Sequence, residues 1–443
     1  MKTTILLITL ACLAAADAAA TAPAWLETDS AAAIETRIRR DFPYTVEQFK
    51  EIAAAYDSTL TPHAIDELIG DRFVETLVID DTVRVFRKAL RNLYLLDPAR
   101  NEGWRHRGAD PGEVRLSYVD SVLDCKAGRN PMGGAHRVTY RFIVQVPNHD
   151  AIQGDTLRIW MPYPLASDRQ DNIRLLETSH PAYTMSDGRS VHNTIYFEVP
   201  VGAAGDTTTV SYTASFDNHG QYFSEEEIMS ALKPYDTASE VYRRYTRMDE
   251  PHIADLSQMA RAIADGETNP YLISRKILNY ISRYPWAGAR EYSTLECIPE
   301  YVIREGHGDC GQVSLLYISM MRSLGIPARW ESGWMLHPGE KNYHDWAEVY
   351  FEGVGWVPVD ASFGRMSASE NPDVIYFYNQ GMDAHRFASN LGVCGELYPA
   401  KRYVRSETVD FQAGEVETSR GNLFYPAWDS TFDIISIIPI ETK

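Results

Sequence analysis

The stretch GDCGQVSLLYISMMRSLGIP, residues 308–327, contains the start and the stop signals of one helix. Asp309 is a favourable N-cap, and Gln312, three residues later, completes a capping box. Gly325 suits the position after the helix, and Pro327 cannot continue it. The apolar residues between these signals fall on one face: Val313, Leu316, Tyr317, Met320 and Leu324. The sequence therefore predicts a helix from Cys310 to about residue 324.

Cys310 occupies the first turn of this predicted helix, where unpaired backbone N–H groups and the helix dipole favour an anion. Formation of a nucleophilic thiolate is assisted at such a position. Asp309 acts in the opposite direction, because a neighbouring carboxylate raises a thiol pKa. A lone cysteine is more often a small core residue. A catalytic interpretation of Cys310 therefore needs a histidine partner.

A predicted β-hairpin supplies that histidine. Residues 344–351 and 356–362 alternate apolar and polar side chains and are joined by Glu352-Gly353-Val354-Gly355. If Phe351 pairs with Gly355, then His344 lies diagonally beside Asp360 on one face, within reach of it. A two-residue turn would instead send the two side chains to opposite faces. The catalytic hypothesis thus requires a three-residue loop or a bulge.

An aspartate that accepts from one imidazole nitrogen leaves the other nitrogen free to take a thiol proton. The sequence therefore gives Cys310 as nucleophile, His344 as base and Asp360 as the residue that orients the histidine. Taken singly, such a histidine is more often a surface residue of a strand and such an aspartate a turn residue at a strand end, so the catalytic hypothesis rests on their joint arrangement with Cys310.

These segments resemble the transglutaminase-like superfamily. The matching pieces are Gly308-Asp309-Cys310-Gly311, Leu324 to Arg329, His344 to Tyr350 and Gly355 to Asp360, in the family's order and spacing. The resemblance implies an α+β fold with a papain-like core preceded by a β-sandwich, and hydrophobic periodicity adds an N-terminal helical region before them. It also implies acyl transfer through a thioester, with the three roles carried by Cys310, His344 and Asp360.

Relatives also use an upstream tryptophan or polar side chain to help bind the oxyanion, and Trp286 is the nearest candidate. Gly311 in the first helical turn, His307 and Trp346 are further candidates for the oxyanion site or the substrate cleft, as is Asp345. No calcium loop or zinc motif is present, so no metal or other cofactor is expected.

The family resemblance leaves several activities open. We expect a cysteine hydrolase of peptide or protein amides, that is, a protease, amidase or deamidase, with glycoproteins among its possible substrates. Amine transfer is the alternative within the same chemistry. A module that binds protein or glycan through an inactive cleft is the alternative from another class.

The first 20 residues predict export. Lys2 precedes a short apolar run, and Ala18-Ala19-Ala20 fits a signal-peptidase site, so a secreted or periplasmic protein without a membrane span is expected. Lipid anchoring at Cys12 stays open. A disulfide could join two of the remaining cysteines, Cys125, Cys297 and Cys394. The net charge of −19 argues against nucleic-acid binding, because phosphates are repelled.

Changes of pattern along the chain divide it into five parts. A helical N-terminal region is expected over 21–110, where Val83, Phe86 and Leu90 recur at helical spacing. A β-sandwich is expected over 111–220, the catalytic core over 221–365, and a strand-rich extension packed on the core over 366–443. In that extension, residues 374–378 and 434–438 are plausible strands.

Overall fold

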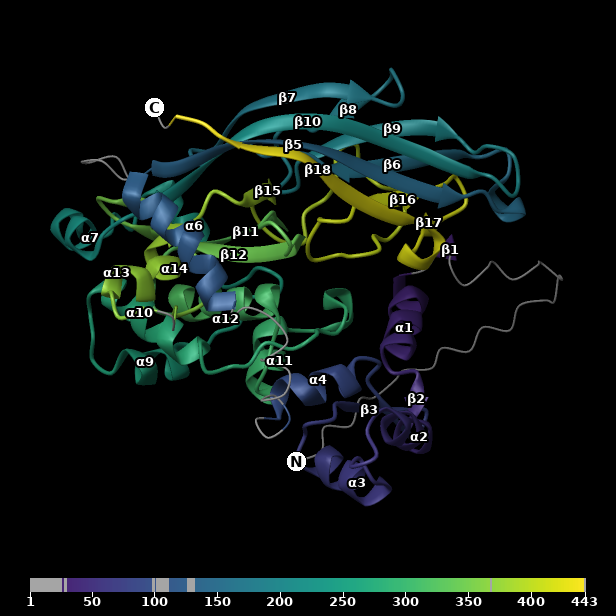
Figure 1. Ribbon diagram of the computed structural model, residues 1–443, viewed down its shortest axis with the longest axis horizontal. Helices are drawn as coiled ribbons and strands as arrows, with labels where there is room; N and C mark the ends of the chain where they lie inside the picture. The colour runs from purple at the N-terminus through teal and green to yellow at the C-terminus, as the bar shows by residue number, and fades with distance from the viewer. Residues whose placement is uncertain are drawn as a thin grey trace.

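A computed structural model describes residues 26–27, 30–97, 100, 111–125, 132–366 and 369–441 of the chain. The fold is α+β, as expected. An N-terminal region, a β-sandwich and a mixed core lie against one another, and Figure 1 shows the sandwich above the core and the N-terminal region below it. The predicted signal peptide over 1–20, including Cys12, falls outside the described residues.

The N-terminal region contains a small sheet as well as helices. Its strands are ordered β2-β4-β3. The prediction of helix around Val83 was wrong, because Asp80 and Asp81 both adopt positive φ (48° and 58°) and close a tight hairpin between β3 and β4. The elements of this region are α1 (Ser30–Asp41), β2 (Tyr44–Thr45), α2 (Val46–Tyr56), α3 (Pro62–Gly70), β3 (Thr76–Ile79), β4 (Thr82–Val85) and α4 (Ala89–Leu96).

The β-sandwich consists of two antiparallel sheets that enclose one hydrophobic core. Within the described residues, one sheet has the order β1-β17-β16-β6-β9-β8, and the other has the order β14-β10-β5-β18 with β7 added on β10. Its strands are β1 (Leu26–Glu27), β5 (Met132–Pro147), β6 (Thr156–Pro162), β7 (Gln170–Thr178), β8 (Thr184–Met185), β9 (Thr194–Pro200), β10 (Thr207–Tyr222), β14 (Gly381–Met382), β16 (Glu415–Glu417), β17 (Asn422–Leu423) and β18 (Asp429–Pro439). The single-turn helices η1 (Asp150–Ile152) and η3 (Tyr425–Ala427) interrupt its loops.

The structure departs from the expected division at both ends of the sandwich. Residues 111–125 form helix α6 (Pro111–Cys125), which packs on β5 and β10 rather than supplying strands. The C-terminal extension contributes β16, β17 and β18 to the sandwich instead of packing on the core alone (Figure 1). The strand predicted over 434–438 is confirmed within β18, where Phe432 is buried in the sandwich core.

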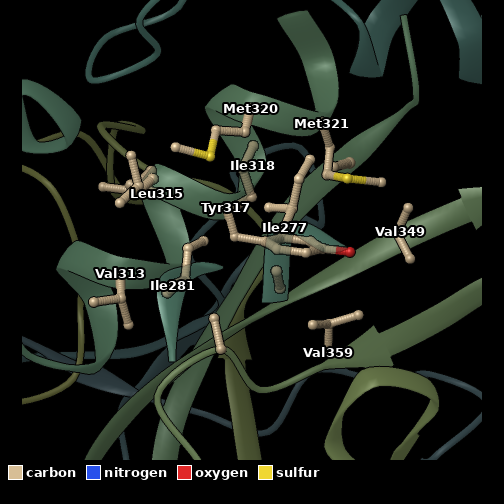
Figure 2. Close-up of a cluster of buried hydrophobic side chains, with 14 of the residues drawn as sticks. Ile277, Ile281, Val313, Leu315, Tyr317, Ile318, Met320, Met321, Val349 and Val359 are labelled. Carbon is tan, nitrogen blue, oxygen red and sulfur yellow. The ribbon is translucent and has the colours of Figure 1, made fainter. Parts of the chain in front are cut away.

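The core of the chain packs helix α12 (Cys310–Ser323) against a sheet of order β13-β12-β11-β15. Figure 2 shows Tyr317 and Met321 of α12 facing Ile277 of the neighbouring helix and Val349 of the sheet. The elements are α7 (Glu225–Ala231), α8 (Glu240–Tyr245), α9 (Ser257–Ala264), α10 (Pro270–Ile281), η2 (Tyr292–Thr294), α11 (Ile298–Glu305), α12, β11 (Ala328–Met335), β12 (Asn342–Phe351), β13 (Gly355–Val359) and β15 (Arg386–Asn390).

Two short helices, α13 (Pro372–Ile375) and α14 (Phe377–Gln380), replace the strand expected over 374–378. Asn371 caps the first of them by accepting from the Asp373 backbone N–H, and Pro372 occupies the first helical position, where it is well tolerated. Among the described residues, no helix is long and apolar enough to cross a membrane.

Candidate active site

Helix α12 begins where the sequence predicts, with Cys310 as its first residue. The Asp309 side chain accepts from the Gln312 backbone N–H, and the Gln312 side chain accepts in return from the Asp309 N–H, both at 3.2 Å. Gly325 follows the helix with φ +73°. The predicted capping box and the predicted stop are therefore confirmed, and they fix the thiol at the positive end of a buried helix.

The hairpin that carries His344 has the predicted register. Phe351 pairs with Gly355 across β12 and β13, so three residues form the loop. Asp360 directly follows β13, and its Oδ2 lies 2.7 Å from His344 Nε2. Both side chains are buried. The second imidazole nitrogen, Nδ1, is thereby left to exchange a proton with another group.

Cys310 and His344 line one cavity of about 780 Å³. The residues of its wall come from three parts of the chain that are far apart in the sequence: the N-terminal region, the core and the C-terminal extension. Among the lining residues are Arg87, Lys88, Arg115, Trp286, Arg290, Glu291, Tyr292, Asp309, Glu340, Lys341, Asp345, Ser362, Phe363, Glu407, Asp410 and Gln412. The N-terminal region thus forms part of the cleft.

The thiol of Cys310 has a carboxyl partner that the sequence named only as a cleft candidate. Cys310 Sγ donates to Asp345 Oδ2 at 3.3 Å, and Gln412 Nε2 donates to Asp345 Oδ1 at 2.6 Å. The same Gln412 nitrogen lies 3.0 Å from the carbonyl oxygen of His344. Asp345 follows His344 in the strand, so it points to the opposite face, which packs on α12.

This environment keeps Cys310 a thiol in the free protein. Burial, then the carboxylates of Asp345 and Asp309, raise the pKa of Cys310 well above its ordinary value. Burial likewise raises the pKa of Asp345 well above its usual range, with Asp410 and Asp309 adding to the effect. The helix terminus favours an anion, but two buried carboxyl groups oppose it. A nucleophile in this site therefore needs a base at the moment of attack.

His344 has the protonation state that such a base needs. Burial lowers its pKa below 6.5, and the cation of Arg386 adds to this, although Asp360 acts in the other direction. The imidazole is therefore neutral at pH 7. Burial alone would raise the pKa of Asp360, but His344 and Arg386 hold it well below its usual range, so Asp360 is an anion.

Arg386 and Asp383 extend the His344–Asp360 pair into the interior. Arg386 Nη2 lies 3.1 Å from Asp360 Oδ2 and 3.3 Å from Asp383 Oδ2, and the arginine is 1% exposed. Tyr378 donates to Asp383 Oδ2 at 3.0 Å. No sequence pattern pointed to these residues, because they lie in the extension beyond the recognisable motifs and meet Asp360 only through the tertiary fold.

The remaining predicted site residues have different surroundings. Trp286 lines the cavity and is 42% exposed, with Arg91 5.4 Å from its ring centroid. His307 is buried against Tyr301 and is not among the cavity-lining residues. Trp346 is fully buried and donates through Nε1 to Glu331, so it packs behind His344 rather than in the cavity.

Three buried groups lie very close to the Cα atom of Gly311 and leave no room for a side chain. A Cβ added there would lie 2.3 Å from Tyr292 Oη, 2.7 Å from Asp345 Oδ2 and 2.8 Å from a ring carbon of Trp330. Among the described contacts, the backbone N–H groups of Cys310 and Gly311 have no hydrogen-bond acceptor. Two donors at a helix N-terminus beside the thiol can therefore bind an oxyanion.

We expect Gly311→Ala to lower the free energy of unfolding by about 1–3 kcal/mol, the usual cost of overpacking a tight core. Movement of Asp345 or Tyr292 would also misplace the thiol, so acyl transfer should fall. Chemical denaturation and turnover assays measure the two effects. Gly70→Ala is the matched control, because nothing lies within 4 Å of its Cβ position. Equal stability and activity in the two variants would contradict the packing described here.

One group of side chains in the described part of the chain could hold a metal ion. Ligand atoms of His337, Asp383 and His385 lie within 4.8 Å of one another. His337 Nε2 already lies 2.9 Å from Asp383 Oδ1, and Arg386 neutralises the other oxygen. The charge of Asp383 is thus balanced by protein groups, and the cluster is separate from the cavity-lining residues.

The described cysteines are free thiols: Cys297, Cys310 and Cys394. Cys297 and Cys394 therefore do not pair with each other. The side chain of Cys125 falls outside the described part of the structure.

Comparison with known proteins gives one family match. The model of the transglutaminase-like superfamily matches residues 257–361, which contain all three predicted catalytic residues. No curated protein sequence matches the chain.

Among the solved structures that are similar to this chain, two show how distant the similarity is. The first is a provisionally named cysteine protease from Cytophaga hutchinsonii, at 14% identity and TM-score 0.44, covering 69% of this chain and 92% of that one. The second is the periplasmic domain of TgpA from Pseudomonas aeruginosa, at 15% identity and TM-score 0.27, covering 57% and 92%.

Proposed function

We propose that this chain, whose residues 257–361 match the model of the transglutaminase-like superfamily, is a cysteine hydrolase of peptide or protein amides. The observation that carries the proposal is the 2.7 Å contact of His344 Nε2 with Asp360, in a cavity that also holds Cys310 at a helix N-terminus. A buried carboxylate that orients a neutral imidazole, in the same cavity as a thiol at a helix N-terminus, supplies the groups that nucleophilic catalysis needs.

The proposed reaction starts from the thiol. As Cys310 Sγ attacks the amide carbonyl carbon, the thiol proton passes to the free ring nitrogen of His344 instead of staying with Asp345. Asp360 stabilises the imidazolium that forms. The backbone N–H groups of Cys310 and Gly311 donate to the oxyanion.

Collapse of the tetrahedral intermediate completes the acyl transfer. The C–N bond breaks, the leaving amine takes the proton from His344, and a thioester remains on Cys310. His344 then removes a proton from water, which attacks the thioester and releases a carboxylic acid and the thiol. An amine that enters in place of water would give a new amide by the same steps.

We place this reaction outside the cytoplasm on the strength of the signal-peptide pattern in residues 1–20. Water is abundant there, whereas free amine acceptors are not assured, and this supports hydrolysis over amine transfer. Protein and peptide substrates, including glycoproteins, are the class that we propose.

The test is incubation of the mature protein with glutamine-rich proteins and a tagged primary amine, followed by mass spectrometry. Cleaved peptides, acid side chains and amine adducts distinguish protease, deamidase and transferase. The pH dependence of kcat/KM should show an acid limb below pH 6.5, because His344 must be neutral to accept the proton. Absence of all three products across varied substrates, with the fold intact, would overturn the proposal.

A further inference from the structure

We propose that the acidic wall of the cavity, formed by Asp345, Glu407 and Asp410, binds a primary ammonium group on a substrate of Cys310. The inference rests on the proposed function and names the substrate class. These carboxyl groups come from β12 and from the segment between β15 and β16, and they line the same cavity as the thiol. Asp345 contacts Cys310 directly, at 3.3 Å.

The carboxyl group of Asp410 is buried without an ion-pair partner in the described part of the chain. Asp410 is 9% exposed, and its carboxylate has no hydrogen bond or ion pair among the described contacts. Arg405 opposes the effect of burial on the pKa of Asp410, but it donates to the backbone oxygen of Asp410 and to Gly395 O, and its Nε lies 3.9 Å from Glu415. A buried carboxyl group without a partner lowers the stability of the folded protein. Its presence in the cavity of the nucleophile therefore needs an explanation.

Glu407 is in a similar position. One of its oxygens accepts from the Val409 backbone N–H at 2.9 Å, and no cation pairs with the carboxylate among the described residues. Burial, followed by repulsion from Asp410, raises the pKa of Glu407 to about 8. Burial raises the pKa of Asp410 to about 7. A bound cation would relieve this repulsion and stabilise both carboxylates.

Five basic residues also line the cavity, and none of them forms an ion pair with Asp345, Glu407 or Asp410 in the described part of the chain: Arg87, Lys88, Arg115, Arg290 and Lys341. Arg87 Nε lies 2.8 Å from Asp41, and Lys88 Nζ donates to the carbonyl oxygen of Ala289 at 3.0 Å. Both belong to the N-terminal region, and they connect it to the core through the Lys88 bond to Ala289 and through Glu291, 3.8 Å from Arg87 Nη2. Arg405 acts against burial in setting the pKa of Glu407 and of Asp410, but no ion pair joins it to either carboxylate in the described structure.

The spacing of the acidic wall favours an ammonium over a metal ion. Within the described residues, only His337, Asp383 and His385 bring three ligand atoms within 4.8 Å of one another. The acidic wall does not converge enough to share one ion. A primary ammonium carries three N–H donors on a flexible chain, so it can pair with separate carboxylates in turn.

Two sources could supply this ammonium. It could belong to the acyl donor, as an N-terminal amine or a lysine side chain near the scissile amide. It could also belong to an amine acceptor that replaces water. Both require the same recognition chemistry next to the thioester.

The experiment measures how fast thiol reagents of different charge modify Cys310. Methanethiosulfonates of similar size carry an ammonium, no charge or a sulfonate, and each forms a mixed disulfide with release of methanesulfinate. Rates at Cys310, read by peptide mass spectrometry, are divided by the rates of each reagent with a simple thiol. We expect the normalised rate of the ammonium reagent to exceed that of the sulfonate reagent by about 100-fold, in the range of electrostatic focusing in clefts.

Asp410→Asn should reduce this charge preference by about 10-fold, with Glu407→Gln acting in the same direction. Asp168→Asn is the matched control, because it removes the same charge from an exposed residue outside the cavity lining and should leave the preference unchanged. Thermal unfolding confirms that each variant folds. A preference near unity in the wild type, or one that Asp410→Asn does not change, would overturn the acidic subsite.

The neutral reagent separates this inference from the proposed function. If it modifies Cys310 readily while charge has no influence, the nucleophile stands and only the subsite fails. If it does not modify Cys310 at all, the proposed function fails. Matched peptide amides with a free or acetylated amine, assayed with and without added alkylamine, assign the ammonium to the donor or to the acceptor. Indifference in both assays would count against the subsite.

Discussion

The Asp360→Asn protein is expected to fold and to lose acyl-transfer activity by about 10⁴-fold, the effect of the same change in a serine-protease triad. Asp360 Oδ2 holds His344 Nε2 at 2.7 Å, while Oδ1 accepts from the backbone N–H groups of Ser362 and Phe363 at 3.1 and 3.0 Å. An asparagine that keeps its oxygen on the turn must present its NH₂ group to the histidine. His344 would then carry its proton on the other nitrogen and could not accept one from Cys310.

The loss should appear in kcat rather than in substrate binding, because the asparagine keeps the size and the turn contacts of the aspartate. The melting temperature should fall modestly, because the buried Arg386 loses Asp360 as a charge partner but keeps Asp383. Asp373→Asn is the matched control, since Asp373 accepts from Tyr222 and lies outside the catalytic network. An Asp360→Asn protein that retains more than a tenth of the wild-type kcat would contradict the orienting role.

His344→Ala is expected to slow modification of Cys310 at pH 7 by about 10²–10⁴-fold, the contribution of a general base. Burial and two neighbouring carboxylates hold the pKa of Cys310 high, so almost no thiolate exists at pH 7 without help. In the wild type the neutral imidazole takes the proton as the sulfur reacts. Without it, the rate should rise only in strongly alkaline solution.

Much of the catalytic group was predictable, because local signals set its parts. The capping box fixed the start of α12 at Cys310, and the two glycines of the hairpin allowed the three-residue loop that brings His344 beside Asp360. The strand alternation that places His344 on one face also places Asp345 on the other, toward α12. The side of the strand on which Asp345 lies follows from the same register. The distance between helix α12 and strand β12, which brings Asp345 to the thiol, could not be predicted from the sequence.

The surroundings of the catalytic group were not predictable in the same way. Arg386 and Asp410 lie in the extension after residue 365, in segments where no strand or motif was predicted. They reach Asp360 and the cavity because β15 joins the core sheet and β16 joins the sandwich. Such long-range strand pairing depends on the whole fold. For the same reason, the contribution of β16, β17 and β18 to the sandwich was not predicted.

The N-terminal region shows the limit of periodicity as a signal. Val83 and Phe86 fit a helical spacing, yet a tight turn at Asp80 and Asp81 makes this segment a hairpin strand. β-branched residues next to a turn that tolerates positive φ favoured the strand. The same region supplies Arg87 and Lys88 to the cavity wall, a placement that composition and spacing did not indicate.

The measurement that tests the catalytic role of Cys310 and His344 most directly is the rate of Cys310 alkylation by iodoacetamide between pH 4 and 10, in wild type and His344→Ala, with Cys297 and Cys394 as internal references. The wild-type rate at Cys310 should rise through a pKa below 6.5, level off, and exceed both references at pH 7. The variant should lose this neutral-pH reactivity. Identical profiles for Cys310 in the two proteins would contradict a nucleophile served by His344.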